Sequence, residues 1–142
     1  MYGPFELIQR ILPYLDLIYI DLKVFDEHLH QEYTNVSSQK IKEHIQYILE
    51  SEHKHKVIIR TPLIPSMTAT DDNIKHIAQF LVNIDKDVQY ELLNYNPLAS
   101  SKYELVQLEY GVDKKYKMFT TQQMQHFYDI VYETGLKNLI IE

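Results

Sequence analysis

The chain has 142 residues, of which 45% are hydrophobic, and a formal net charge of −6 with histidine neutral. This length and composition suit one packed domain, so we expect residues 1–142 to form a single domain. The acidic balance argues against nucleic acid as the main partner, because phosphate binding needs a basic face. The absence of cysteine excludes disulfides, thiol nucleophiles, metal thiolates and cysteine-ligated clusters within these residues.

Helical and strand-like patterns alternate along the chain. A short helix is predicted from Pro4, a favourable first helical residue, through Leu12. Apolar spacing of the i, i+3, i+4, i+7 kind predicts three further helices, within 41–49, 74–82 and 124–132. Runs rich in Ile, Leu, Val and Tyr predict strands at Leu15–Leu22, Val57–Ile64, Val88–Tyr95 and Leu139–Ile141. The alternation predicts an open α/β sheet of parallel strands in sequence order.

Local signals mark several helix ends. Ser37 or Ser38 is the expected cap of the helix within 41–49. Thr120 with Gln123 forms the pattern of a capping box, and Gly135 fits the position just after a helix. The segment Pro97–Phe119 is longer than most loops, and we expect part of it to pack as a helical turn.

Polar residues follow the predicted strands at the end where parallel α/β folds place their chemistry. Asp21 and Lys23 are two residues apart and therefore share one face of their strand. Arg60 interrupts an apolar strand and needs a partner there, since an unpaired buried charge is costly. Asn94 and Asn96 also share a face, so these groups can converge on one ligand. The alternatives are a surface ion pair for D-x-K and an Arg60 whose head reaches solvent at the rim.

Four blocks of the sequence are similar to glycyl-radical-enzyme activases of the pyruvate formate-lyase-activating type. They are DLIYIDLK, DEHLHQEYTNVSSQKI, VIIRTPLIPSMTATDDNI and YELLNYNPLASSKY, in the order and at the distances seen in that family. The resemblance implies the parallel-sheet half of a partial (β/α)6 TIM-like barrel, the radical-SAM fold. It also implies an enzyme that binds S-adenosylmethionine beside a [4Fe–4S] cluster and generates a glycyl radical on a partner, a glycyl radical enzyme.

The resemblance assigns roles to single residues. Asp21, Lys23, Arg60 and Asn96 match positions that contact or lie near the cofactor, and we expect no catalytic residue and no metal ligand in this chain. Thr34, Asn35 and Ser37 match a T-G-x-S-like turn, with Asn35 where glycine is common. Asn94 likewise stands where proline is common, and the NPLASSKY wording is closer to activases of other glycyl radical enzymes.

The family's CxxxCxxC loop has no counterpart here, because the chain contains no cysteine. We therefore expect the cluster-binding N-terminal half to be absent. The isolated chain should be inactive and carry no bound cofactor, because the half of the site that remains should bind S-adenosylmethionine only weakly. A non-catalytic half-barrel that binds a partner protein or an anionic ligand is the alternative function.

Three further expectations concern the location of the protein, its histidines and its self-association. No apolar run of 18 residues and no signal-like opening occur, so we expect no membrane span and a cytoplasmic protein. The spacing of His28/His30 and of His53/His55 does not by itself indicate a metal site. His53 and His55 lie in the stretch SEHKHK, which is typical of a solvated helix end, whereas His28 and His30 follow the D-L-K strand and their role is left open. The strand Leu15–Leu22 contains nothing that protects a sheet edge, so a homodimer through that edge is possible.

Overall fold

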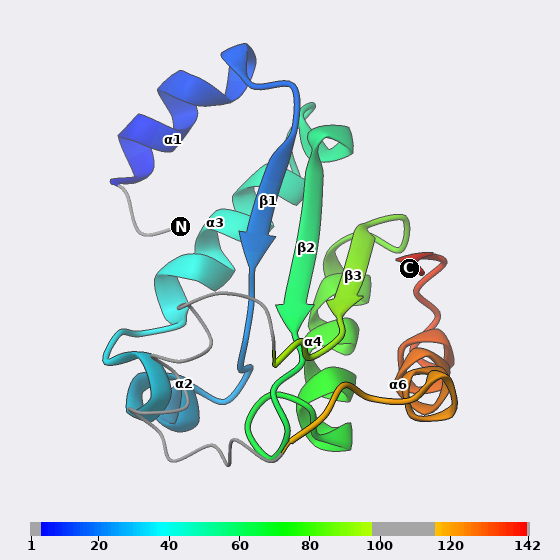
Figure 1. Cartoon of the computed structure of the whole chain (residues 1–142). Helices are drawn as coiled ribbons and strands as arrows, with labels where there is room; N and C mark the ends of the chain where they lie inside the picture. Colours follow the sequence, from blue (N-terminus) through cyan, green and yellow to red (C-terminus); the bar gives the residue numbers. More distant parts are fainter. Residues whose placement is uncertain (1–3, 98–115, 142) are drawn as a thin grey trace.

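The computed structural model describes residues 4–97 and 116–141 (Figure 1). Most of the predicted long segment, including its expected helical turn, lies outside these residues. The elements in chain order are α1 (Phe5–Ile11), the 3-10 helix η1 (Leu12–Tyr14), β1 (Ile18–Asp21), α2 (Glu27–Thr34), α3 (Gln39–Leu49), the 3-10 helix η2 (Lys54–Lys56), β2 (Val57–Pro62), α4 (Asp71–Ile84), β3 (Gln89–Leu93), α6 (Thr121–Glu133) and β4 (Asn138–Ile140).

The four strands form one sheet in the order β1-β2-β3-β4, and all neighbours are parallel. This confirms the predicted parallel sheet in sequence order. The strands β1, β2 and β3 are shorter than the predicted runs, whereas β4 has the predicted length and starts one residue earlier. β1 starts at Ile18 because Pro13 favours the tight 3-10 turn η1 just before it.

One face of the sheet is covered by helices and forms the core. Alternate strand residues point into it, so that Ile20, Ile59 and Leu92 are fully buried. Buried residues of α3, α4 and α6 belong to the same cluster, among them Ile45, Ile77 and Val131. We call this the covered face; α3 and α4 lie behind the sheet in Figure 1.

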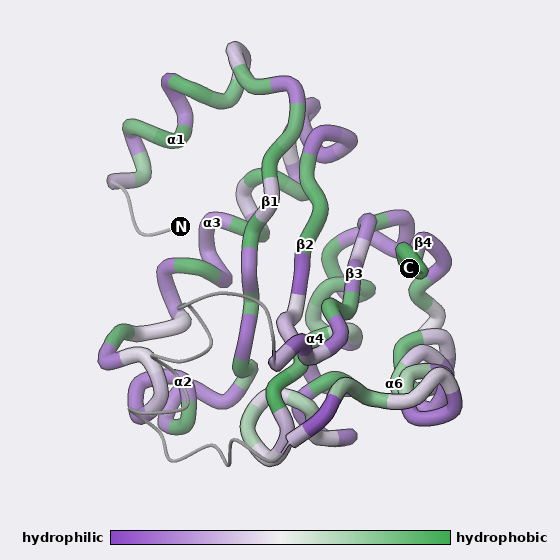
Figure 2. The backbone as a smooth tube through the Cα atoms, viewed as in Figure 1, coloured by the Kyte–Doolittle hydropathy of each residue, from purple (hydrophilic) through white to green (hydrophobic). Residues whose placement is uncertain are grey.

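The other face, which we call the open face, displays the intervening strand residues. Along β2 the burial pattern alternates between buried and half-buried positions up to Thr61. The same alternation puts Tyr19, Ile58 and Gln89 in one row of the open face, because the register aligns them across three strands. In Figure 2 the hydrophobic stretches of β1 and β2 give way to hydrophilic positions toward their carboxyl ends.

The helix ends follow the predicted chemistry in part. Thr120 and Gln123 form the expected capping box, and Gly135 has φ +94° just after α6. Ser38 is the N-cap residue of α3, but its hydroxyl donates to Glu27 rather than capping the helix. Pro4 precedes α1 as its N-cap instead of being its first residue.

The helix α2 has no counterpart among the predicted elements. It is short and polar, and His30 is its single buried residue, so it lacks the apolar stripe from which a helix is recognised. Its cap is clear in the structure: the side chain of Asp26 accepts from the Leu29 N–H at 2.9 Å. No helix in the described part of the chain is long and apolar enough to cross a membrane.

Candidate functional site

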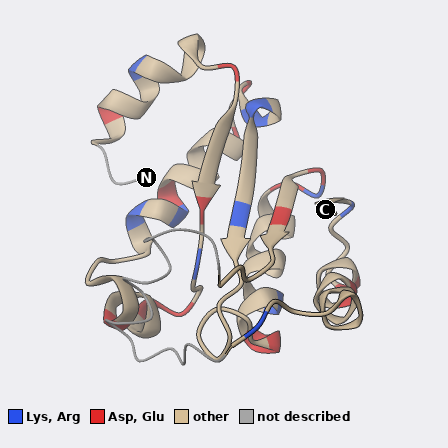
Figure 3. Ribbon diagram, viewed as in Figure 1, with Lys and Arg blue, Asp and Glu red and all other residues tan. Residues whose placement is uncertain are grey.

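A row of charged residues crosses the open face near the carboxyl ends of the strands. The register places Asp21 beside Arg60 and Arg60 beside Glu91. Arg60 Nε donates to Asp21 Oδ1 at 3.0 Å, with both side chains about a quarter exposed, at 29% and 26%. Figure 3 shows charges of both signs on adjacent strands at this level. Arg60 therefore finds the partner that its position in a strand requires, and that partner is Asp21 on the next strand.

An aromatic ring completes the pair. The guanidinium carbon of Arg60 lies 4.4 Å from the ring centroid of Tyr19, which is the distance of a cation–π contact. Tyr19 lies two residues before Asp21 and is on the same face of β1. Arg60 is thus oriented by a carboxylate and by a ring, and its remaining guanidinium N–H groups are fixed in direction.

Lys23 extends the same face beyond the end of β1. The burial alternation continues past the strand, with Leu22 and Val24 buried and Lys23 half-buried between them. Within residues 4–97 and 116–141, no carboxylate forms an ion pair with the Lys23 ammonium. The D-x-K motif is therefore no internal ion pair. Among the described residues, a lysine without an ion-pair partner thus follows, two residues after Asp21, an Asp–Arg pair that is already neutral.

Two buried hydroxyl groups link the carboxyl end of β2 to the residue after β1 and to β3. Thr61 Oγ1 donates to the Leu22 carbonyl at 2.7 Å and lies 2.6 Å from the Tyr90 hydroxyl. Because Thr61 has one hydroxyl hydrogen, Tyr90 is the donor in that second bond. Burial raises the pKa of Tyr90, which keeps the phenol protonated and able to donate. The sequence contained no signal for this chain of bonds.

The two asparagines after β3 have different surroundings. The Asn94 side chain exchanges two hydrogen bonds of 2.9 Å with the peptide of Phe119. It holds the chain that enters α6, so its amide is already satisfied and does not join the charged row. Asn96 is half-buried and lies beyond β3, at the same end of the sheet as Asp21 and Arg60.

The turn after α2 has the conformation that the family pattern anticipates. Asn35 has φ 60° in the left-handed region, where glycine is the easiest residue and asparagine is also tolerated. His30 Nδ1 lies 2.9 Å from the Val36 carbonyl oxygen, so this buried histidine anchors the turn. His28 is exposed and lies 4.0 Å from Glu32. In the described part of the chain, no three His, Asp or Glu side chains converge as a metal site would require.

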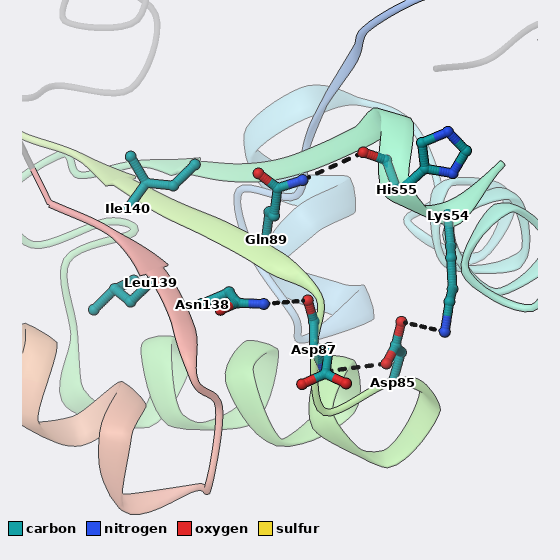
Figure 4. Close-up of a pocket in the computed structure, with 8 residues that line it drawn as sticks. All are labelled: Lys54, His55, Asp85, Asp87, Gln89, Asn138, Leu139 and Ile140. Atoms are coloured by element: carbon teal, nitrogen blue, oxygen red, sulfur yellow. Dashed lines mark hydrogen bonds and ion pairs between the residues drawn. The ribbon is translucent and has the colours of Figure 1, made fainter.

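A hollow of about 610 Å³ lies at the opposite end of the sheet, where β2, β3 and β4 begin (Figure 4). Several of its polar groups already serve the connections around it. Gln89 donates to the His55 carbonyl, Asn138 donates to the Asp87 carbonyl at 2.8 Å, and Lys54 lies 3.5 Å from Asp85. The candidate functional site is therefore the carboxyl end of the sheet, where parallel sheets generally bind their ligands.

The known proteins that are similar to the chain include several activating enzymes. It is 35% identical over 112 residues to the (2S)-3-sulfopropanediol dehydratase activating enzyme of Klebsiella oxytoca, which covers 78% of the chain and 35% of that protein. It is 31% identical over 137 residues to the indoleacetate decarboxylase activating enzyme of Tractidigestivibacter scatoligenes, covering 96% of the chain and 42% of that relative. The chain is homologous to the activating enzymes of glycyl radical enzymes.

A solved structure is similar to the whole fold. It is a domain of a pyruvate-formate lyase-activating enzyme from Bacteroides vulgatus, with a TM-score of 0.76 and 24% identity, over 100% of this chain and 76% of that domain. The expected fold class, a parallel α/β sheet of the radical-SAM activating-enzyme kind, is thereby confirmed. No protein-family model matches the chain. The chain spans about two fifths or less of the two curated relatives described, at 42% and 35% of their lengths.

Proposed function

We propose that this chain provides the cofactor-facing carboxyl-terminal half of a radical-SAM activating enzyme that acts on a glycyl radical enzyme. The observation that carries the proposal is the Asp21–Arg60 pair beside the unpaired Lys23, on the open face at the carboxyl ends of the strands. Homology to activating enzymes supports the same conclusion. The whole of residues 1–142 then forms one part of a larger barrel.

The chemistry of these side chains fits S-adenosylmethionine. The methionine end of this molecule carries a carboxylate and an ammonium, and its ribose carries hydroxyls. Lys23 and the outer N–H groups of Arg60 are donors for a carboxylate, and Asp21 is an acceptor for an ammonium or a hydroxyl. Asn96 lies at the same end of the sheet and offers both a donor and an acceptor. When bound and reduced, the sulfonium supplies the radical that the activating reaction uses.

A [4Fe–4S] cluster has no ligands in this chain, because cluster iron is held by cysteine thiolates and none of the 142 residues is cysteine. The proposal therefore assigns the cluster loop to polypeptide outside these residues. The side chains named above bind and orient the cofactor, and we derive no electron transfer through them.

The partner follows from the same homology. The relatives activate different enzymes, a (2S)-3-sulfopropanediol dehydratase in one and an indoleacetate decarboxylase in another. We propose a glycyl radical enzyme as the partner of the complete protein. Pyruvate formate-lyase is one member of that class.

The test is a titration of the ¹⁵N-labelled chain with S-adenosylmethionine, followed through backbone amide shifts up to about 10 mM ligand, which detects even millimolar binding. We expect saturable shifts around Asp21, Lys23 and Arg60. Asp21→Ala and Lys23→Ala should each weaken binding by about 1–3 kcal/mol, the cost of a lost charge-assisted hydrogen bond.

Two variants control for charge alone. Asp71 is a carboxylate in an exposed pair with His126, and Lys54 is a lysine at the amino end of the sheet. Asp71→Ala and Lys54→Ala change the net charge equally and should leave binding unchanged. Equal weakening by test and control variants, or shifts that inorganic phosphate reproduces, would favour the anionic-ligand module over a cofactor site.

A second expectation concerns the activity of the isolated chain, which contains no cysteine to hold a cluster. The isolated chain, reconstituted anaerobically with iron and sulfide, should form no 5′-deoxyadenosine above background from S-adenosylmethionine. Product above background would show that the chain assembles an active centre without cysteine and would contradict the assignment of the cluster to other residues.

A further inference from the structure

Just after β1 the Leu22 N–H still donates to the Arg60 carbonyl of β2 at 2.9 Å, and several further peptide groups of residues 22–25 are bonded by side chains. The Leu22 carbonyl accepts from Thr61, as described above. The Lys23 carbonyl accepts from Asn73 Nδ2 at 2.8 Å, and the Phe25 N–H donates to Asn73 Oδ1 at 2.8 Å. The Phe25 carbonyl accepts from Lys42 Nζ at 2.6 Å. Beyond Leu22, side chains thus provide the hydrogen bonds that the backbone of β2 would provide along a longer strand.

Asn73 is the centre of this arrangement. It lies in the first turn of α4, where the cap residue Thr70 accepts from its N–H, and it is 8% exposed. Its Nδ2 also donates to the Thr68 carbonyl at 2.9 Å, so both amide hydrogens and the amide oxygen are used. The orientation of the amide follows from this set of partners, because a flipped group would face two carbonyls with its oxygen.

We propose that Asn73 is a positioning residue for Lys23, an inference that rests on the proposed function of the site. Its amide bonds the Lys23 carbonyl and the Phe25 N–H, which lie on either side of Val24, in the way that a neighbouring strand would. The start of the Lys23 side chain is therefore fixed relative to the Asp21–Arg60 pair two residues earlier. A site whose charged groups are held before the ligand arrives loses less conformational freedom on binding.

No other residue in the described part of the chain bonds these two peptide groups. Thr61 reaches Leu22, and Lys42 reaches the Phe25 carbonyl, but the Lys23 carbonyl and the Phe25 N–H both depend on Asn73. Without the amide these two groups lack partners in a half-buried place, and the strand end must move to reach water. Lys23 then loses its fixed direction while the charged groups themselves are still present.

The test compares Asn73→Ala, the near-isosteric Asn73→Asp and the control Ile77→Val in the full 142-residue chain. Ile77 is fully buried on the same helix, so its truncation lowers stability while the hydrogen-bonding amide of Asn73 is kept. Two quantities are measured: hydrogen exchange of the Phe25 amide, and the dissociation constant for S-adenosylmethionine from amide shifts. Urea unfolding of each variant records whether it is folded.

In Asn73→Ala we expect Phe25 amide exchange to rise about tenfold or more and affinity to fall about tenfold, as for other residues that orient a ligand-binding group. Asn73→Asp keeps the acceptor for Phe25 but turns an oxygen toward the carbonyls of Lys23 and Thr68. It should therefore keep the Phe25 amide protected and still lose affinity. Ile77→Val should change neither quantity by more than about twofold at equal fraction folded.

A folded Asn73→Ala or Asn73→Asp variant with the affinity of the unsubstituted chain would overturn the inference. If the unsubstituted chain itself binds no S-adenosylmethionine, the proposed function fails. In that event the Phe25 amide alone decides whether Asn73 holds the strand end, and unchanged exchange in Asn73→Ala refutes it.

Discussion

The two faces of the sheet differ most clearly at two neighbouring residues of β2. Ile58 points to the open face and is half-buried, whereas Ile59 points to the covered face and is fully buried. Two positions later along the open face stands Arg60, paired with Asp21, while the covered face continues with Thr61 bonded to Tyr90. The same strand therefore serves the core with one set of side chains and the site with the other.

This comparison explains why polar and charged residues are tolerated in the middle of a sheet. Each charge of the open face has a partner on the adjacent strand or reaches the solvent-facing side, so no isolated charge is buried. Each polar atom on the covered face is hydrogen-bonded, and the described residues contain no buried side-chain nitrogen or oxygen without a partner. Stability should therefore depend on one face, and ligand binding on the other.

The largest expected effect is a difference in stability between variants of the two isoleucines. Ile59→Ala should lower the free energy of unfolding by about 3–4 kcal/mol, because it leaves a cavity under the helices. Ile58→Ala, the matched control one residue away, should cost about 1 kcal/mol or less, since its side chain is already partly in water. Urea unfolding measures both. Equal losses would break the distinction between the faces.

The second prediction tests the hydroxyl chain on the covered face. Tyr90→Phe should destabilise the chain by about 1 kcal/mol, because the Thr61 hydroxyl oxygen loses its donor. Tyr19→Phe on the open face should change stability by less than about 0.5 kcal/mol. Chemical denaturation of the two variants side by side gives the answer, and a larger loss for Tyr19→Phe would contradict it.

We also expect the stability of the chain to depend on pH through the Tyr90 phenol. Its folded-state pKa is raised by burial, so its contribution is complete below the unfolded pKa of about 10 and is lost as pH rises above that value. The unsubstituted chain should therefore lose more stability between about pH 9.5 and about pH 11 than Tyr90→Phe does. Parallel slopes for the two proteins would show that the phenol ionises as easily in the fold as in water.

The sequence predicted the covered face better than the open one. Apolar spacing located α4 and α6, and the pattern Thr120/Gln123 located a helix start, because these signals are local. The pairing of Asp21 with Arg60 depends on the register of two strands 39 residues apart, so the sequence supplied the two residues but not their contact. Asn73 gave no signal at all, since its partners lie on a different element.

A further prediction concerns the loop that joins α2 to α3. Glu27 accepts from the Ser38 N–H at 3.0 Å and from the Ser38 hydroxyl, and these bonds, the hydroxyl first, lower the pKa of Glu27. A lowered folded-state pKa gives stability that is present above the unfolded pKa and is lost as pH falls through the folded value. Glu27→Gln should therefore be less stable than the unsubstituted chain at about pH 6, with the difference shrinking toward about pH 3.5. A difference independent of pH would contradict the role given to the carboxylate.

The smallest expected effect is weak self-association of the chain through an edge of the sheet. β1 is an edge strand of the described sheet, and Tyr14, Leu17 and Tyr19 near it are exposed by 86%, 50% and 48%. We predict weak self-association through this edge, which Leu17→Lys should reduce and Ile141→Lys, at the β4 edge, should not. Sedimentation equilibrium over a wide concentration range measures it. A strictly monomeric chain throughout would refute the expected dimer.

We propose that S-adenosylmethionine binds to the open face at Arg60. The chain contains two arginines, Arg60 on that face and Arg10 on α1, so their side-chain Nε–H signals in a ¹⁵N spectrum form a probe and its internal control. On addition of S-adenosylmethionine, we expect the chemical shift of the Arg60 signal to change and to reach a plateau. The Arg10 signal should stay in place. An Arg60 signal that does not move, or that moves only together with Arg10, would contradict it.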